Sequence, residues 1–403
     1  MAADIISSVE ARASTVWTSV AEEVAAKLRE DAPERDRGNA APEREIELLR
    51  SSGLLTAFIP AELGGGDGDP STADEVTRII TAADASIGHL IGYHYLHVWR
   101  SELFDQDQAT RLRRETAANQ WFWGGVANPL DAALELTPTE DGFLVNGRKT
   151  FATGASIADR LVVSGTRTDT GEKLTFTMDA RANGVRYLGD WDNIGQRLTE
   201  SGGVLFTDAP VAADDVLGVH PGKENEETPA ALRLSLAQIA FQAVLSQLHV
   251  GIAEGALAQA AEYTRTMSRP WFLSGAEKAT DDLYVLVGYG ELVASTEAAG
   301  LMADHASAML YAAAAEPELT PELRAAAALT ISSAKVVSTR VVNEVTSKIF
   351  EFVGARATAS KYGFDRFWRN ARTITLHDPV SYKARELGAH LLAGELPPIT
   401  GYS

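Results

Sequence analysis

The chain has 403 residues, of which 45% are hydrophobic and 23% charged, a composition that supports a large globular core. It contains no cysteine, which excludes disulfides, thiolate metal ligands and a cysteine nucleophile. The formal net charge of −19 argues against nucleic acid or an anionic membrane surface as a partner. Neither a signal peptide nor a membrane span is predicted, so we expect a cytoplasmic protein.

The first part of the chain, residues 1–118, carries helical signals and is predicted to form an N-terminal helical domain. Apolar residues recur every four positions from Val16 to Leu28, which places them on one face of a helix. A glycine-rich break follows at residues 59–70. The apolar stretch at residues 85–99 then predicts a buried helix.

Residues 119–222 have a different residue pattern, which predicts a β domain. Short runs rich in β-branched and aromatic residues alternate with turn signals, among them Asp141-Gly142 and Asn146-Gly147. We expect these runs to pair as a small antiparallel β-barrel or sandwich between the two helical parts.

Long apolar helical stretches return after a charged segment and predict a C-terminal four-helix bundle over residues 230–403. Near the end of the chain, Asp378 and Pro379 have the pattern of a helix start, with Asp378 as the N-cap and Pro379 in the first helical position. The predicted fold class is therefore mainly α with a central β domain.

Four sequence segments in this order resemble those of the acyl-CoA dehydrogenase fold. They are "IPAELGGGDG" at 59–68, "VNGRKTFATGASIAD" at 145–159, "KIFEFVGARA" at 348–357 and "RNAR" at 369–372. None is specific alone, but their order and spacing extend the resemblance over nearly the whole chain. The resemblance implies the same helix, β-domain, helix architecture.

One position departs from the dehydrogenase pattern. Many dehydrogenases have a glutamate after the segment that resembles "RNAR", and that glutamate removes the substrate α-proton, whereas this chain has His377. The stretch "FWRNARTITLHDPVSYK" at 367–383, with "SRPW" at 268–271 and "HLIGYH" at 89–94, resembles instead the flavin-dependent monooxygenase branch of the fold, which includes dibenzothiophene monooxygenases.

This resemblance implies a two-component monooxygenase. Such enzymes take reduced FMN from a separate flavin reductase, form a C4a-hydroperoxyflavin with O₂, and oxygenate a small hydrophobic substrate, here expected at sulfur, as in dibenzothiophene or a sulfone, or at nitrogen. FMN is expected rather than FAD. No Gly-x-Gly-x-x-Gly motif follows a predicted strand, so no nicotinamide site is expected, which agrees with electrons arriving from another protein.

The resemblance also implies four catalytic residues. His377 is expected to hydrogen-bond the flavin-bound oxygen, because an imidazole titrates near neutral pH. Thr153 is expected to bond flavin N5 or the same oxygen. His89 and Tyr93, which are four residues apart and share a helix face, are expected to line the substrate pocket. Related enzymes have a second histidine where this chain has Ile374.

The cofactor would be bound by residues of two kinds, and no metal site is predicted. Two loop residues and Thr153 are expected to flank the isoalloxazine, and arginines are expected to bind the phosphate, since guanidinium pairs well with phosphate. By analogy the arginines come from another subunit, which predicts a homotetramer. The predicted cofactor-binding residues are Asn128, Phe151, Thr153, Arg269, Trp271, Arg356 and Arg369.

Alternatives remain open at this stage. His377 could be a structural residue bonded to Asp378, and His89, Tyr93 and Phe151 could be core residues. The protein could be an FAD-dependent acyl-CoA dehydrogenase with an atypical base, or a catalytically inactive binding protein on the same fold. The dehydrogenase would be purified yellow and would be reduced by acyl-CoA, whereas the binding protein would have no affinity for flavin.

Overall fold

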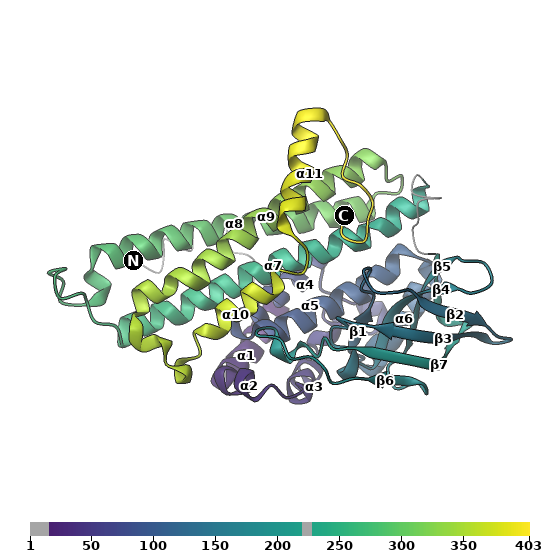
Figure 1. Cartoon of the computed structure of the whole chain (residues 1–403), viewed down its shortest axis with the longest axis horizontal. Coiled ribbons are helices and arrows are strands. Elements are labelled where there is room, and N and C mark those ends of the chain that lie inside the picture. Colours follow the sequence, from purple (N-terminus) through teal and green to yellow (C-terminus); the bar gives the residue numbers. More distant parts are fainter. Residues whose placement is uncertain (1–15, 220–227) are drawn as a thin grey trace.

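The computed structural model describes residues 16–219 and 228–403. Figure 1 shows three parts: a block of short helices, a β-sheet at one end of the molecule, and long helices that run the length of the other side. The fold is the predicted one, mainly α with one β domain. The C-terminal tail returns across the long helices (Figure 1).

The N-terminal block contains six α-helices. α5 is buried over its whole length, which agrees with its apolar sequence. His94 connects it to the sheet, because its Nε2 bonds to the carbonyl of Leu55 at 2.6 Å and its Nδ1 accepts from the amide of Trp123 at 3.1 Å. The helices are α1 (Val16–Glu30), α2 (Ala32–Gly38), α3 (Glu43–Ser51), α4 (Pro70–Ala83), α5 (Ala85–Trp99) and α6 (Gln106–Asn119).

The β domain is one eight-stranded sheet, and it is mixed rather than antiparallel as predicted. β2 and β3 form a hairpin, but a crossing segment follows β3 and lays β4 parallel to β2 and β1. A parallel pair needs such a crossover, which turn signals alone do not reveal. The strands are β1 (Trp123–Val126), β2 (Leu134–Pro138), β3 (Gly142–Lys149), β4 (Arg160–Arg167), β5 (Lys173–Asp179), β6 (Val185–Tyr187), β7 (Val204–Ala212) and β8 (Val216–Val219).

The C-terminal part is built on three long helices, which α10 joins by packing on α7 and α9. α7 and α9 are long and apolar enough to cross a membrane, but 83% and 67% of their most apolar windows are buried inside the protein. They therefore form the core of the bundle. The helices are α7 (Pro229–Thr266), α8 (Leu283–Ala315), α9 (Pro321–Val353), α10 (Asp365–Ile374) and α11 (Val380–Ala393), which projects from the body (Figure 1).

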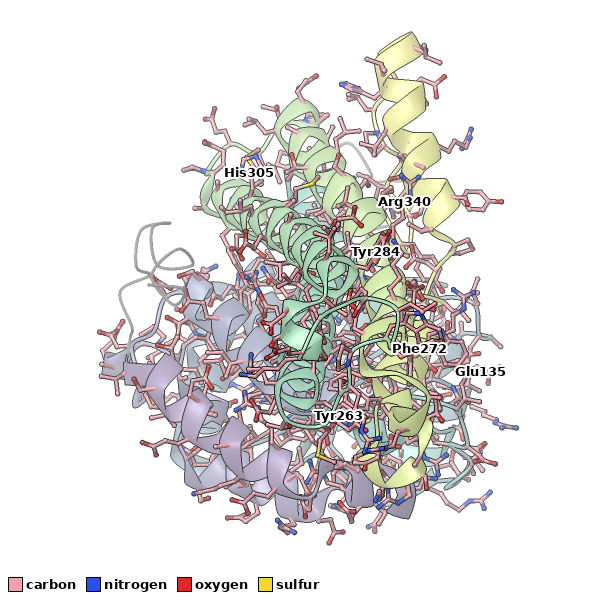
Figure 2. The ribbon with its side chains drawn as sticks, turned by 90° about the vertical axis from the view of Figure 1, so that its left-hand side faces the viewer. Glu135, Tyr263, Phe272, Tyr284, His305 and Arg340 are labelled. Carbon is pink, nitrogen blue, oxygen red and sulfur yellow. The ribbon has the colours of Figure 1, made fainter. Side chains whose placement is uncertain are left out.

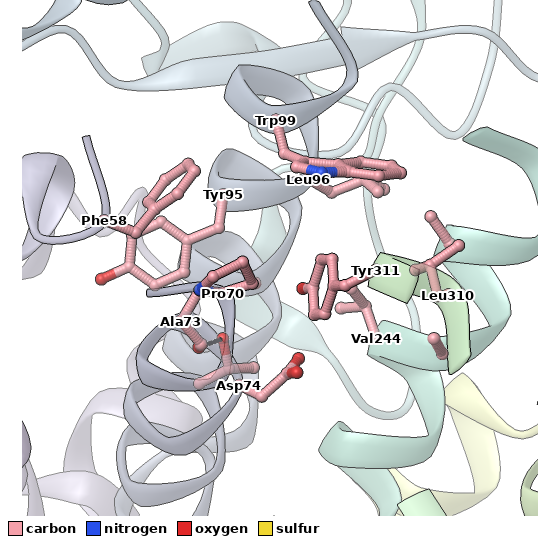
Figure 3. A pocket seen from close by; sticks show the side chains of 14 residues that line it. Phe58, Pro70, Ala73, Asp74, Tyr95, Leu96, Trp99, Val244, Leu310 and Tyr311 are labelled. Atoms are coloured by element: carbon pink, nitrogen blue, oxygen red, sulfur yellow. Dashed lines mark hydrogen bonds between the residues drawn. The ribbon is translucent and has the colours of Figure 1, made fainter. Parts of the chain in front are cut away.

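A small cavity of about 20 Å³ separates α4 and α5 from α7 and α8, and Asp74 and Tyr311 point toward it (Figure 3). The pKa of Asp74 is raised to about 7, mainly by burial and to a smaller extent by the charges of Asp304 and Glu75, while a hydrogen bond from Ser307 and the charge of Arg78 oppose the shift. The folded protein thus holds a proton on Asp74 that the unfolded chain releases near pH 4.

This proton makes stability depend on pH in a defined direction. Between about pH 4 and pH 7 the folded state binds more protons at Asp74, so the free energy of unfolding falls as pH rises. Asp74→Asn cannot ionise and should not lose this stability. We therefore expect the free energy of unfolding of Asp74→Asn, measured relative to the wild type, to be on the order of 1–3 kcal/mol higher at pH 8 than at pH 5. Urea unfolding at both pH values checks this. For the exposed control Glu140→Gln, the difference in unfolding free energy from the wild type should be the same at pH 5 and pH 8. If the difference for Asp74→Asn were also the same at the two pH values, the raised pKa of Asp74 would be contradicted.

Candidate functional site

A cavity of about 1000 Å³ lies where the three parts of the fold meet. Its walls come from α5, from the loops after β1, β3 and β6, from the N-terminal half of α7, from the end of α10 with the turn that follows it, and from the C-terminal tail. This volume is at the upper end of what small-molecule and cofactor sites enclose.

One face of α5 lines the cavity with His89, Tyr93 and His97, which are four residues apart. All three are buried, and the ring of His89 meets the edge of Tyr93 at a centroid distance of 4.3 Å. Within the described part of the chain, His89 Nε2, the Tyr93 hydroxyl and both ring nitrogens of His97 have no hydrogen-bond partner. Buried polar atoms are almost always paired in native proteins, so these atoms indicate a ligand that supplies donors and acceptors.

The protonation states of these side chains follow from burial. Burial lowers the pKa of His89 to about 3, although its bond to Gln196 opposes the shift, and burial also lowers the pKa of His97 well below its ordinary value. Burial raises the pKa of Tyr93, so its hydroxyl keeps its proton. His89 Nδ1 donates to Gln196 Oε1 at 3.2 Å. At neutral pH the cavity therefore meets an acceptor at His89 Nε2 and a donor at Tyr93.

His377 faces the same cavity from the turn after α10. Its Nδ1 donates to Asp378 Oδ1 at 3.1 Å, and its ring packs edge-on against Tyr402 of the C-terminal tail. About a third of the side chain, 33%, is accessible, and Nε2 has no partner among the described residues. The contact with Asp378 is the one a structural histidine would make, but it also fixes the ring so that Nε2 is left for a ligand.

Asp378 is not a helix cap, contrary to the sequence prediction. α11 begins at Val380 with Pro379 as its N-cap residue, and no side chain caps it. The carboxylate instead accepts from the fully buried Lys335 at 3.2 Å. Burial alone would raise the pKa of Asp378, but the bond from His377 and the charge of Lys335 hold it well below its usual range. A buried ammonium needs a counter-charge more than an exposed helix end needs a cap.

The loop after β6 joins α10 to the cavity wall. The amide of Gln196 donates to Asn370 Oδ1 at 2.6 Å. A Cβ at Gly195 would lie 2.0 Å from the carbonyl oxygen of Arg369, so only glycine permits this approach. The contact fixes Gln196 relative to α10 and the turn that carries His377, and Gln196 in turn bonds to His89.

Phe151 and Thr153 line the cavity from the loop after β3. Phe151 has a backbone φ of 53°, an unusual conformation for an aromatic residue, and its ring meets the edge of Trp191 at 6.0 Å. The hydroxyl of Thr153 contacts that of Ser201 at 3.0 Å, which contacts Thr199 at 2.7 Å. The chain of hydroxyls holds Thr153 in place at the cavity wall.

The rim of the cavity is apolar and exposed. Leu130, Phe151, Ile194 and Leu376 all line it, and each side chain is more than half accessible to solvent. Asn128 stands beside this rim, with its carbonyl bonded to Lys149 at 3.1 Å. Exposed apolar side chains around a concave site indicate a ligand surface. Together with the unpaired polar atoms deeper inside, this rim fits a flat aromatic group with polar edges.

The remaining predicted cofactor residues lie away from this cavity. Arg269, Trp271 and Arg356 are exposed at the far ends of α7 and α9 and do not line it. Arg369 does not line it either, because its guanidinium pairs with Asp36 and Asp365 and donates to the carbonyl of Ile194 at 2.7 Å. One copy of the chain thus brings Asn128, Phe151, Thr153, His89, Tyr93 and His377 together, and leaves the other predicted residues outside.

Several lining residues were missed by the sequence analysis, namely His97, Arg100, Lys173, Trp191, Gln196, Gln242, Arg372 and Tyr402. The first two could have been found, because they continue the helical spacing of His89 and Tyr93. Gln242 and Arg372 lie on α7 and α10, and the other four lie on a strand, a loop and the tail, where no sequence pattern singled them out.

Comparison with known proteins agrees with this site. A model of the acyl-CoA dehydrogenase C-terminal domain matches residues 243–382. Dibenzothiophene monooxygenase of Rhodococcus erythropolis is 40% identical over 397 residues, which cover 96% of this chain and 95% of that protein. The probable FMNH2-dependent monooxygenase SfnC of Pseudomonas putida is 39% identical over 389 residues, with 96% and 97% coverage.

A solved structure shows the same likeness in three dimensions. The crystal structure of FMN-bound TdsC from Paenibacillus sp. A11-2 superposes with a TM-score of 0.91 at 39% identity, and the match covers 96% of this chain and 100% of that one. The fold and the sequence agree over nearly the full length of both proteins. The chain therefore belongs to the dibenzothiophene monooxygenase family, the flavin-dependent monooxygenases with the acyl-CoA dehydrogenase fold.

Proposed function

We propose that this protein is the oxygenase of a two-component monooxygenase that uses reduced FMN and O₂ to oxygenate a small organic substrate at sulfur, or at nitrogen. The observation that carries the proposal is the convergence of His377 Nε2, His89 Nε2 and the Tyr93 hydroxyl on one cavity with an apolar aromatic rim. The family membership supports the same reaction class.

The residues of the rim fit an isoalloxazine ring. Phe151 and Trp191 would contact its face or edge, and Asn128 and Thr153 would hydrogen-bond its polar edge. Reduced FMN, when bound, supplies the electrons that activate O₂, and the protein supplies position and electrostatics. FMN rather than FAD is favoured because the similar TdsC structure holds FMN and SfnC is described as FMNH2-dependent.

His377 would handle the proton of the reaction. With Nδ1 held by Asp378, its Nε2 can donate a hydrogen bond to oxygen when protonated and accept one when neutral. The buried Asp378 carboxylate fixes the orientation of the ring, and Lys335 keeps that carboxylate in place. Tyr93 and neutral His89 would orient the substrate on the opposite wall.

The dehydrogenase alternative is not favoured. It requires a buried base, and among the described residues that line the cavity only Asp192 carries a carboxylate, which is exposed at the mouth. The inactive binding protein is not favoured either, because His89 Nε2, the Tyr93 hydroxyl and the ring nitrogens of His97, which have no partner among the described residues, would destabilise the fold without a ligand.

We propose that the oxygenase is a cytoplasmic homotetramer and that a flavin reductase supplies it by diffusion of reduced FMN. An apolar surface at the start of α8 supports assembly, since its side chains are more than half exposed; Phe272 and Tyr284 lie on the face turned to the viewer in Figure 2. The surface contains Trp271, Phe272, Leu273, Leu283, Tyr284 and Leu286. In such a tetramer Arg269 and Arg356 of a neighbouring copy would bind the FMN phosphate.

Stopped-flow mixing tests the function. Protein with one equivalent of reduced FMN is mixed with oxygenated buffer, and the absorbance of oxidised flavin is followed. A monooxygenase that shelters its oxygen-activating flavin delays the return of oxidised FMN well beyond the time needed by free reduced FMN. Return at the rate of free flavin, with immediate release of H₂O₂, would overturn the proposal.

A further inference from the structure

The inner end of the cavity is formed by a charged residue that the proposed chemistry does not use. Arg100 directly follows α5 on the face of His89, Tyr93 and His97, and it lines the cavity. The residue is only 4% exposed, and its Nε has no hydrogen-bond partner among the residues that the structure describes. Burial lowers the pKa of Arg100 to about 10, so the guanidinium remains charged at neutral pH.

A second cation stands at the same end. Lys173, at the start of β5, lines the cavity, and its pKa is lowered by burial and by the charges of Lys149 and Arg100. Over residues 16–219 and 228–403, no carboxylate forms an ion pair with Arg100 or Lys173. Lys149 differs from both, because it donates to the carbonyl of Asn128 at 3.1 Å.

Two cations without carboxylate partners among the described residues are unusual in this chain, because it has 55 acidic and only 36 basic residues. Glu102 lies two residues from Arg100, yet it pairs with Arg113 at 2.9 Å. A buried cation without a counter-charge is strongly disfavoured, and two close together repel each other as well. Such a pair is retained where a ligand supplies the missing negative charge.

We propose that Arg100 and Lys173 bind an anionic group of the substrate, a carboxylate, sulfinate or sulfonate, at the inner end of the cavity. The proposal rests on the proposed function and narrows its substrate to an elongated amphiphile. Seven residues separate Tyr93 from Arg100 and eleven separate His89 from it, which corresponds to about 10 Å and about 16 Å along a helix. The anionic group is thus separated from the oxygenated atom by a chain or ring system of roughly 10 Å.

The wall between these two ends suits such a molecule. Phe241 of α7 packs edge-on against Tyr93 at a centroid distance of 5.1 Å and against His97 at 5.9 Å, and it lines the cavity. An apolar middle would therefore lie against Phe241 and the rings of α5, with the anion at Arg100 and the reacting atom beside His377.

Calorimetric titration of the flavin-free protein tests the site without catalysis. Octanesulfonate and its neutral counterpart octyl methyl sulfone are compared as probes. We expect the wild type to bind the sulfonate at least about tenfold more tightly, because a charge-assisted bidentate contact is lost in the sulfone. Arg100→Met combined with Lys173→Met should remove that preference and leave sulfone affinity within about twofold. Arg186→Met removes one exposed cation of the same domain and should change neither affinity.

Three results would overturn the proposal: equal affinity for the two probes, a preference that survives the double substitution, or inorganic sulfate that binds as tightly as octanesulfonate. A fourth would reassign the cations, namely an FMN affinity that falls about tenfold in the double variant, since the phosphate of FMN would then be the anion. The melting temperature of the double variant should equal or exceed that of the wild type, because an unpaired buried charge is removed. If flavin reoxidation shows no delay but the sulfonate preference holds, the function fails and the anion site stands.

Discussion

Replacing His377 with alanine is expected to shorten the delay before oxidised FMN reappears by about 10²-fold, because one general acid or hydrogen-bond donor contributes that much or more. The His377 ring faces the cavity, and its Nδ1 donates to Asp378 Oδ1 at 3.1 Å. Its Nε2 can therefore bond to the reacting oxygen. Without His377, the cavity would lose the side-chain donor that faces the reacting oxygen when reduced FMN is bound, and more of the O₂ consumed would appear as H₂O₂.

Stopped-flow absorbance with a peroxide assay measures this effect. His305 on α8 is exposed (Figure 2) and does not line the cavity, so His305→Ala is the matched control and should behave as the wild type. His377→Gln, which keeps a donor of similar length, should restore part of the delay. A His377→Ala protein with an unchanged delay and no extra H₂O₂ would remove His377 from the mechanism.

Replacing Lys335 with methionine is expected to lower the free energy of unfolding by about 3–5 kcal/mol, the cost of leaving a buried charge without its partner. Lys335 is fully buried and donates to Asp378 at 3.2 Å and to Gln242 at 2.9 Å. Among the described residues, its loss leaves His377 as the remaining side-chain partner of the Asp378 carboxylate, so the imidazole should also be less well oriented.

Urea unfolding compares this variant with Lys348→Met on the same helix. Lys348 forms an exposed i,i+4 pair with Glu344, and its loss should change the free energy of unfolding very little. The stopped-flow delay of Lys335→Met should also be shorter than that of the wild type under conditions in which both proteins are folded, which a loss of stability alone would not produce. Equal losses of stability in the two variants would show that the buried pair does not hold the site together.

The order of the helical and β parts could be predicted because it rests on local signals. The apolar helix at residues 85–99 and the short strands after residue 119 each carry a periodicity that does not depend on distant residues. The mixed sheet could not be predicted, since the parallel alignment of β1 and β2 with β4 depends on a crossover whose path is set by packing.

The candidate site divides in the same way. His89 and Tyr93 share a helix face that spacing alone reveals, and His377 was found from its place in a family pattern. The role of Asp378 was predicted wrongly, because its partner Lys335 lies 43 residues away on another helix. The same limit applies to Gln196, which reaches His89 across 107 residues. Arg269 and Arg356 remain a prediction about a neighbouring copy.

A crystal structure of the protein with FMN would show whether the cavity is the flavin site. We expect an isoalloxazine ring at the rim formed by Phe151, Trp191 and Leu376, with one of its edges within about 3 Å of Thr153 or His377 Nε2. A ring bound outside this cavity, or one turned so that His377 and Thr153 both face away from it, would show that the assignment of the site is wrong.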